Sequence, residues 1–153
     1  MDVKPWILSK NNKLIKPIST SSSIEVRYAE TDQMGVVHHA NYPIYFEQAR
    51  VNWLRNIGMH YQEMEENGIM LPLSRLIIDY KKPARFGDIL NVKTNLNALP
   101  SASIIFDYEI KNQHDDILTL GQTVLVFVDK KTRRPMRCPE NIMNLILKAS
   151  PKN

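Results

Sequence analysis

The sequence predicts an α+β domain in which one long helix packs on a five-stranded antiparallel sheet. A short candidate strand comes first, a stretch with helical spacing of apolar residues follows, and four stretches with alternating apolar residues come after it in series. Because parallel strands need a crossover between each pair, this separation of helix from strands argues against a doubly wound parallel sheet.

Composition fits one globular domain. The chain has 153 residues, of which 43% are hydrophobic and 24% charged. No stretch approaches the length of a membrane span, so we expect no stable membrane insertion. The first residues are not followed by an apolar region, so we expect no signal peptide and a cytoplasmic location. The net charge of +4 favours anionic partners without choosing among them.

The polar composition of the N-terminal residues predicts that they lie outside the folded domain. Residues 1–23 have no core pattern, and residues 19–23 are a run of serines and a threonine. We therefore interpret 1–23 as an arm or linker and 24–148 as the folded domain. The first strand of that domain is predicted at residues 24–29.

The helix has the clearest local pattern. Phe46, Ala49, Trp53 and Ile57 recur at spacings of three, four and four residues, which places them on one helical face. Pro43 is tolerated in the first turn of a helix, and Gly58 is well placed to end it. These positions predict a helix over residues 43–57.

The strands that follow have a period of two. The alternating segments are residues 75–80, 90–97, 104–111 and 117–128, separated by turn-forming residues. Pro139 opens a short final helix. One face of each strand is apolar, as expected of an antiparallel sheet with one buried face.

The loop between the first strand and the helix carries the candidate chemistry. It contains Asp32, Gly35, His38 and His39. The first N–H groups of a helix lack partners within it and attract negative charge, so they could polarise a carbonyl that Asp32 attacks directly or through water. The residues alone leave a second interpretation open, in which Asp32 only stabilises an Asx turn.

A resemblance adds to this interpretation. The run Glu30-Thr31-Asp32-x-x-Gly35-Val36-Val37-x-His39-Ala40-Asn41-Tyr42, with Phe46-Glu47-x-Ala49-Arg50 after it, closely resembles the signature of the 4-hydroxybenzoyl-CoA thioesterase-like family, particularly its YbgC-type acyl-CoA branch. Asp79-Tyr80-Lys81-Lys82-Pro83-Ala84 is similar to the end of the family's second strand. The resemblance covers about residues 24–147.

The resemblance implies a hotdog fold and acyl-CoA thioesterase activity. It implies that Asp32 is the nucleophile or general base, that the main-chain N–H at His39 polarises the thioester, and that Tyr28 and the His39 ring contribute to activity. It further implies active sites at the interface of a homodimer or homotetramer, with no metal or other cofactor. The substrate contacts that we expect in the loop are Gly35, Val36, Val37 and Asn41.

One departure concerns the substrate. The benzoyl-CoA branch of the family has a proline after the catalytic aspartate, whereas Gln33 follows Asp32 here. This argues against 4-hydroxybenzoyl-CoA itself.

The basic residues suggest where coenzyme A binds. Two basic runs could meet its phosphates, and within them we expect Arg85 and the Arg133-Arg134 pair to do so, although a solvated loop is the better interpretation of each residue taken singly. The runs are Lys81, Lys82 and Arg85, and Lys130, Lys131, Arg133, Arg134 and Arg137. Neither a recognition motif nor interleaved aromatic residues accompany these cations, so we expect no nucleic acid partner. Adjacent histidines rarely bind one ion, so we expect no metal at His38 and His39.

Two further residues need an interpretation. Glu47 on the helix is a rival to Asp32 as the base, although a structural role fits it better. Cys138, the only cysteine, is interpreted as an inert structural thiol.

Other functions on the same fold stay open. A domain that binds acyl-CoA without turnover, a thioesterase acting on acyl carrier protein, and a hydratase or dehydratase are the alternatives to an acyl-CoA thioesterase.

Overall fold

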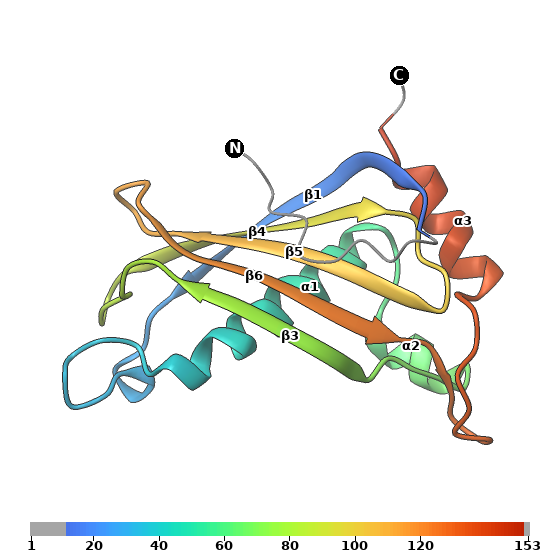
Figure 1. Cartoon of the computed structure of the whole chain (residues 1–153), viewed down its shortest axis with the longest axis horizontal. Coiled ribbons are helices and arrows are strands. Elements are labelled where there is room, and N and C mark those ends of the chain that lie inside the picture. Colours follow the sequence, from blue (N-terminus) through green and yellow to red (C-terminus); the bar gives the residue numbers. More distant parts are fainter. Residues whose placement is uncertain (1–11, 152–153) are drawn as a thin grey trace.

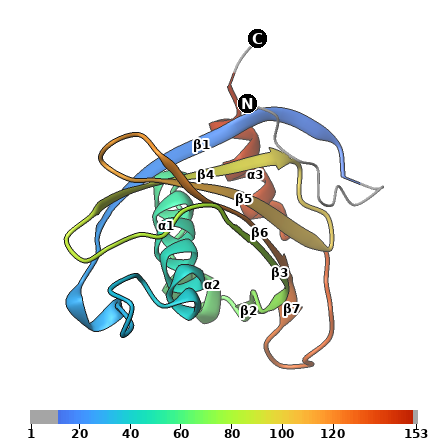
Figure 2. The same cartoon turned by 60° about the vertical axis from the view of Figure 1, so that its left-hand side comes forward.

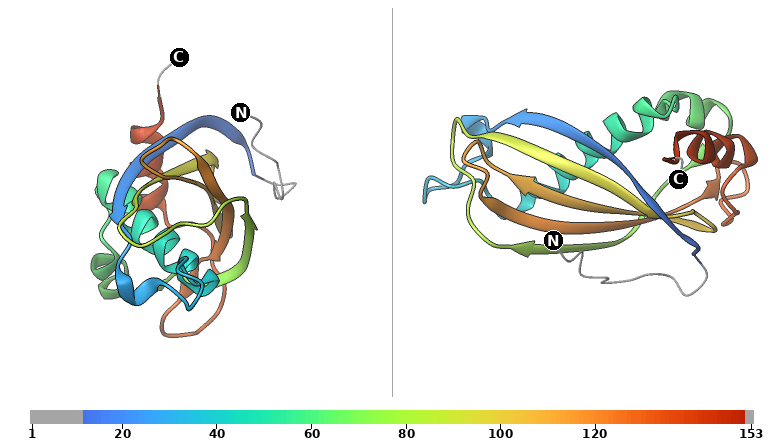
Figure 3. Two further views of the ribbon diagram at one scale, coloured as in Figure 1. Left: turned by 90° about the vertical axis from the view of Figure 1, so that its left-hand side faces the viewer. Right: turned by 90° about the horizontal axis from the view of Figure 1, so that it is seen from above.

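The computed structural model describes residues 12–151. Five strands form one antiparallel sheet in the order β1-β4-β5-β6-β3, which curls around the helix α1 (Figure 1). Figures 2 and 3 show α1 on the concave side of this sheet. The predicted hotdog architecture is therefore confirmed. The bounds are Leu14–Glu25 for β1, Tyr42–Asn56 for α1, Leu73–Tyr80 for β3, Ile89–Ala98 for β4, Ser103–Lys111 for β5 and Ile117–Val126 for β6.

Short elements lie between these strands and after the last of them. The periodicity of the sequence did not predict most of them, because each is too short to show a repeating pattern. The final helix α3 is the exception, and it was predicted from Pro139. The bounds are Tyr28–Glu30 for η1, His39–Asn41 for η2, Tyr61–Glu66 for α2, Ile69–Met70 for β2, Val128–Asp129 for β7 and Glu140–Ala149 for α3.

The core lies between α1 and the sheet. Phe46, at the second turn of α1, stacks on Tyr108 of β5 with ring centroids 4.4 Å apart. A Cβ atom at Gly121 of β6 would lie 2.3 Å from the Phe46 ring, so only glycine fits beneath it. At the other end of α1, the Trp53 indole donates a hydrogen bond of 2.8 Å to the Ile18 carbonyl of β1. The helix is thus fixed on the sheet at both ends.

The start of the sheet differs from the prediction. Strand β1 begins at Leu14, so residues 14–23 are part of the sheet and not an arm or linker; residues 1–11 lie outside the described part. Residues 28–30 form the 3-10 helix η1 and not the end of a strand. The serine-rich run was misleading because strands pair through the backbone: Ser19 to Ser23 lie opposite Asn95 to Asn91 of β4.

Strand β3 forms one edge of the sheet. Leu73, Leu76 and Tyr80 on this strand are 49%, 36% and 50% exposed, which is unusual for large apolar side chains on one element. Over residues 12–151, no helix is both long and apolar enough to cross a membrane.

Candidate active site

The loop after η1 closes on Asp32. Oδ1 of Asp32 accepts hydrogen bonds from the main-chain N–H of Met34 at 2.8 Å and of Val36 at 3.4 Å. The Asp32 N–H donates to the Val36 carbonyl at 2.8 Å, and Gly35 takes a positive φ of 77° inside the turn. Asp32 is therefore an Asx-turn residue through Oδ1. Within residues 12–151, no donor lies within hydrogen-bond distance of its second oxygen, Oδ2.

The loop is held against the segment that follows β3. Val37 donates its N–H to the Ala84 carbonyl at 2.8 Å, and Val36 forms a bridge with Arg85. Thr31 and Val37 pair with each other across the base of the loop. Asp32 and the residues that begin η2 therefore flank the same short bridge.

The buried carboxylate of Glu30 fixes the start of the loop through hydrogen bonds. The residue is only 8% exposed, and its carboxylate accepts hydrogen bonds from the Arg27 N–H at 2.9 Å and from the Tyr45 hydroxyl at 3.0 Å. Burial alone raises the pKa of Glu30, but these hydrogen bonds and the Arg27 guanidinium outweigh it, and the pKa is lowered overall. Glu30 is thus an ionised structural carboxylate.

The turn that precedes α1 has one free N–H. Asn41 donates its N–H to the His38 carbonyl at 2.9 Å, and Ala40 donates its N–H to Nδ1 of His38 at 3.1 Å. The Tyr80 hydroxyl donates to the His39 carbonyl at 2.9 Å. The described residues provide no acceptor for the His39 N–H. A free N–H at the start of helical structure is suited to bind an oxyanion.

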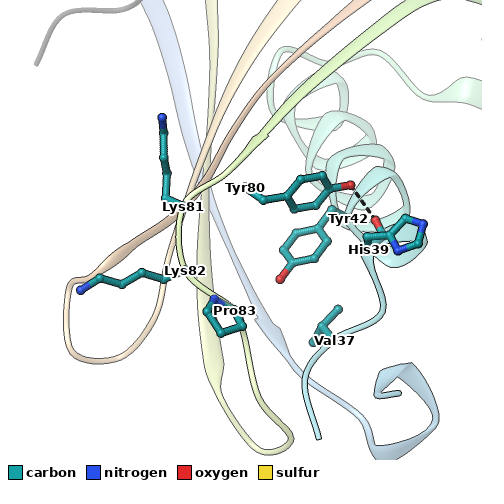
Figure 4. Close-up of a pocket in the computed structure, with 7 residues that line it drawn as sticks. All are labelled: Val37, His39, Tyr42, Tyr80, Lys81, Lys82 and Pro83. Atoms are coloured by element: carbon teal, nitrogen blue, oxygen red, sulfur yellow. Dashed lines mark hydrogen bonds between the residues drawn. The ribbon is translucent and has the colours of Figure 1, made fainter. Parts of the chain in front are cut away.

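A small cavity opens beside this turn (Figure 4). Its volume is about 220 Å³. The ring of Tyr80 packs edge-on against Tyr42 at 5.2 Å, and burial raises the pKa of both hydroxyls, so both are neutral at neutral pH. The residues that line the cavity are Val37, His39, Tyr42, Tyr80, Lys81, Lys82 and Pro83.

The predicted loop residues lie together. Val37 and His39 line the cavity, whereas Gly35 and Val36 shape the loop through their backbones. The side-chain amide of Asn41 donates to the main-chain carbonyl of Glu30 at 2.8 Å and so connects the turn to η1.

The other predicted residues lie further out. Tyr28 is 77% exposed and packs on Phe86, with ring centroids 5.7 Å apart. Arg85 is exposed next to Val36. Arg133 and Arg134 lie in the loop after β7, at the opposite end of the sheet from the Asp32 loop (Figure 1). One chain alone therefore does not bring these two arginines to Asp32.

Sequence reasoning gave no site role to Tyr80, and it counted Lys81 and Lys82 only among the basic residues that could meet coenzyme A. All three line the cavity. The available signal was their position, because Tyr80 ends β3, where it meets the turn before α1, and the two lysines follow it directly.

The two rival residues lie elsewhere. Glu47 is exposed and lines a groove between β1 and the outer side of α1, together with Ser21 and Asn52. Burial raises the pKa of the Cys138 thiol to about 12, which matches an unreactive thiol. Residues 12–151 contain no group of three or more His, Cys, Asp or Glu side chains arranged to hold a metal ion.

Comparison with known proteins decides the family. A model described as "Thioesterase-like superfamily" matches residues 26–146. The chain belongs to the thioesterase-like superfamily. This confirms the resemblance and, at the level of the family, the prediction of a thioester hydrolase.

Relatives and a solved structure agree with this membership of the thioesterase-like superfamily. The chain is 34% identical to "Putative acyl-CoA thioesterase YneP" of Bacillus subtilis over 118 residues, which are 77% of this chain and 86% of that protein. It is 28% identical to "Acyl-CoA thioester hydrolase YbgC" of Escherichia coli O157:H7, over 78% of this chain and 90% of that protein. The crystal structure of DHNA-CoA thioesterase from Staphylococcus aureus superposes with a TM-score of 0.81 at 33% identity, covering 85% of this chain and 89% of that one.

The anchoring role of Glu30 can be tested by its dependence on pH. Glu30→Gln should lower the free energy of unfolding at pH 7 by about 1–3 kcal/mol, because charged hydrogen bonds to Arg27 and Tyr45 are lost. The pKa of Glu30 is lower in the folded chain than in the unfolded chain, so its contribution is present above the unfolded pKa and is lost as pH falls through the folded pKa. The difference between wild type and variant should shrink as the pH falls below about 4.3, the usual pKa of an unperturbed glutamate.

Urea denaturation at several pH values measures this difference. Glu25→Gln, at an exposed carboxylate on β1, is the matched control and should change stability little at any pH. A difference for Glu30→Gln that stays constant or grows on acidification would contradict the role of its charge.

Proposed function

We propose that this thioester hydrolase acts on an acyl-CoA, which it cleaves to the free carboxylic acid and CoA. The observation that supports this most strongly is a pair of free groups flanking one bridge: the N–H of His39 beside the cavity and Oδ2 of Asp32 on the adjoining turn. The names of the YneP and YbgC relatives point to the same substrate class.

The chemistry needs only these groups and water. A thioester carbonyl on the His39 N–H is polarised, and the oxyanion that forms on attack is stabilised there. In one route Asp32 attacks the carbonyl carbon, the C–S bond breaks, CoA leaves as the thiolate, and water hydrolyses the acyl anhydride. In the other route Asp32 takes a proton from water, the hydroxide adds, the same C–S bond breaks, and Asp32 returns its proton to the departing thiolate.

Cations near the cavity would hold the phosphates of CoA. Nζ of Lys81 lies 3.9 Å from Oδ2 of Asp79, and Nζ of Lys82 lies 3.6 Å from Oδ1 of Asp116. All four side chains are substantially exposed. Exposed ion pairs of this kind are worth little, so either lysine can turn to a phosphate at small cost. Arg85, across the Val36 bridge, extends this basic surface.

The assembly that fits this site is a dimer formed through the edge strand β3. This edge strand exposes unpaired backbone groups and the apolar side chains of Leu73 and Leu76. Pairing with a second copy would satisfy the backbone groups and bury these side chains. In an antiparallel pair related by a twofold axis near the strand centre, the Leu73 end of one copy lies beside the Tyr80 end of the other.

This pairing brings a second set of arginines toward the site. Strand β2 and its partner β7 lie at the Leu73 end of β3, and the loop after β7 carries Arg133 and Arg134. In the dimer, Arg133 of the partner subunit and Arg134 of the partner subunit would approach the cavity beside Tyr80. Two such dimers could form a tetramer. We place the enzyme in the cytoplasm, where acyl-CoA is available.

A substrate panel tests the activity. The wild-type protein should release thiol from at least one of acetyl-CoA, butyryl-CoA, palmitoyl-CoA, benzoyl-CoA and 1,4-dihydroxy-2-naphthoyl-CoA, detected with a chromogenic disulfide. A matched set of acyl carrier protein thioesters distinguishes the carrier. Binding to acyl-CoA without release of thiol would favour a binding module, and addition or loss of water at the acyl chain would favour a hydratase. Either result would overturn the proposal.

The dimer predicts complementation between two damaged variants. Asp32→Asn has intact arginines, and Arg133→Ala/Arg134→Ala has an intact Asp32. If the arginines act across the interface, each mixed dimer has one complete site. At substrate concentrations well below KM, refolding an equal mixture should raise activity above both parents, toward about a quarter of wild type.

Sedimentation checks the interface itself. Leu73→Lys/Leu76→Lys places like charges across the paired edge and should give a folded monomer with little activity. Ile89→Lys, at an exposed apolar residue on β4, is the matched control and should remain a dimer. An active monomer, or the absence of any complementation, would contradict this assembly.

A further inference from the structure

Two successive peptide planes are fixed at the start of η2. In the first plane, the carbonyl of His38 accepts the Asn41 N–H at 2.9 Å. In the second, the His39 carbonyl accepts the Tyr80 hydroxyl at 2.9 Å, and the Ala40 N–H donates to the His38 ring at 3.1 Å. Because a peptide unit is planar and trans, a held carbonyl also sets the direction of the N–H on the same plane.

The free N–H belongs to the first of these planes. The His39 N–H shares its plane with the His38 carbonyl and so points away from Asn41. Rotation of the neighbouring plane would change the backbone angles at His39 and loosen this orientation. Among residues 12–151, only the Tyr80 hydroxyl reaches the second plane from outside the turn, because the other contacts come from residues 38–41 themselves.

We propose that Tyr80 is a positioning residue for thioester hydrolysis, whose hydroxyl holds the His39 carbonyl so that the free His39 N–H keeps its aim at the substrate oxygen. This rests on the proposed function. Tyr80 acts through the backbone of His39 and does not itself exchange a proton with substrate.

The surroundings of Tyr80 fit this role. Its ring packs edge-on against Tyr42, the first residue of α1, with ring centroids 5.2 Å apart (Figure 4). This contact with the helix fixes the direction in which the Tyr80 hydroxyl points. Tyr80 is also the last residue of β3. Tyr80 thereby links the end of the edge strand to the backbone of His39, so the position of β3 affects the position of the free N–H.

Tyr80→Phe tests the role with minimal change. It keeps the ring against Tyr42 and removes one hydrogen bond. The expected result is a fall in kcat of about threefold to tenfold, the usual effect of one neutral hydrogen bond, with KM changed by less than about twofold. The substrate is the acyl-CoA that the wild-type protein hydrolyses fastest in the panel above.

A spectroscopic measurement distinguishes a role in positioning the His39 N–H from a purely structural role of Tyr80. The probe is the same acyl-CoA with a ¹³C-labelled carbonyl, bound to Asp32→Asn so that turnover is slow. Its infrared carbonyl band should shift to lower frequency on binding, and this shift should be smaller in Asp32→Asn/Tyr80→Phe. A mispositioned donor polarises the carbonyl less, whereas a purely structural role for Tyr80 would leave the band where it is.

Tyr61→Phe is the matched control. It removes a tyrosine hydroxyl that accepts a hydrogen bond of 3.2 Å from Arg50, away from the cavity, and should leave kcat and the carbonyl band unchanged. If wild-type protein hydrolyses no thioester, the proposed function fails. If wild type is active but Tyr80→Phe retains both kcat and the band shift, or raises KM alone, the role of Tyr80 is wrong and the function stands. Equal losses in Tyr80→Phe and Tyr61→Phe would also overturn it.

Discussion

The contact between Phe46 and Gly121 determines where the site lies. Glycine is the only residue that leaves room for the ring, so Phe46 can pack directly on the backbone of β6, and it also stacks on Tyr108. A stacked pair of this kind adds about 0.5–1.5 kcal/mol to the burial of its area. With the second turn of the helix fixed there, Tyr42 at its start lies against Tyr80 and the Ala84 backbone. The cavity follows from this placement.

Two carboxylates near the helix start then have different roles because their surroundings differ. Glu30 is buried, and hydrogen bonds from Arg27 and Tyr45 occupy its carboxylate, so it holds the loop. Asp32 lies two residues later and is half-buried, and only one of its oxygens is used by the turn. An Asx turn and a catalytic carboxylate are therefore compatible in one residue, since the turn fixes the side chain and leaves Oδ2 for chemistry.

Side-chain periodicity predicted the elements that bury apolar surface. The helix and four strands were found because their inward faces repeat at 3.6 or 2 residues. Strand β1 was missed over most of its length because its pairing with β4 uses the backbone, and its serines reveal little of that pairing. The same reason explains why Tyr80 was missed, since its bond to the His39 carbonyl leaves no pattern in the sequence. The resemblance pointed to Asp32 and His39 as site residues, whereas the role proposed for Arg133 and Arg134 would need a second copy, which no single chain contains.

The central claim is that the loop of Asp32, and not the helix, carries the base or nucleophile. Comparing kcat for wild type, Asp32→Asn and Glu47→Gln on the best acyl-CoA tests it most directly, with circular dichroism confirming that each variant is folded. Asparagine keeps the turn-forming oxygen and removes the charge, so kcat should fall by at least about a hundredfold, as expected on loss of a general base. Glu47→Gln, on the exposed side of α1, should change kcat little. Near-normal kcat in Asp32→Asn together with a large loss in Glu47→Gln would contradict the account.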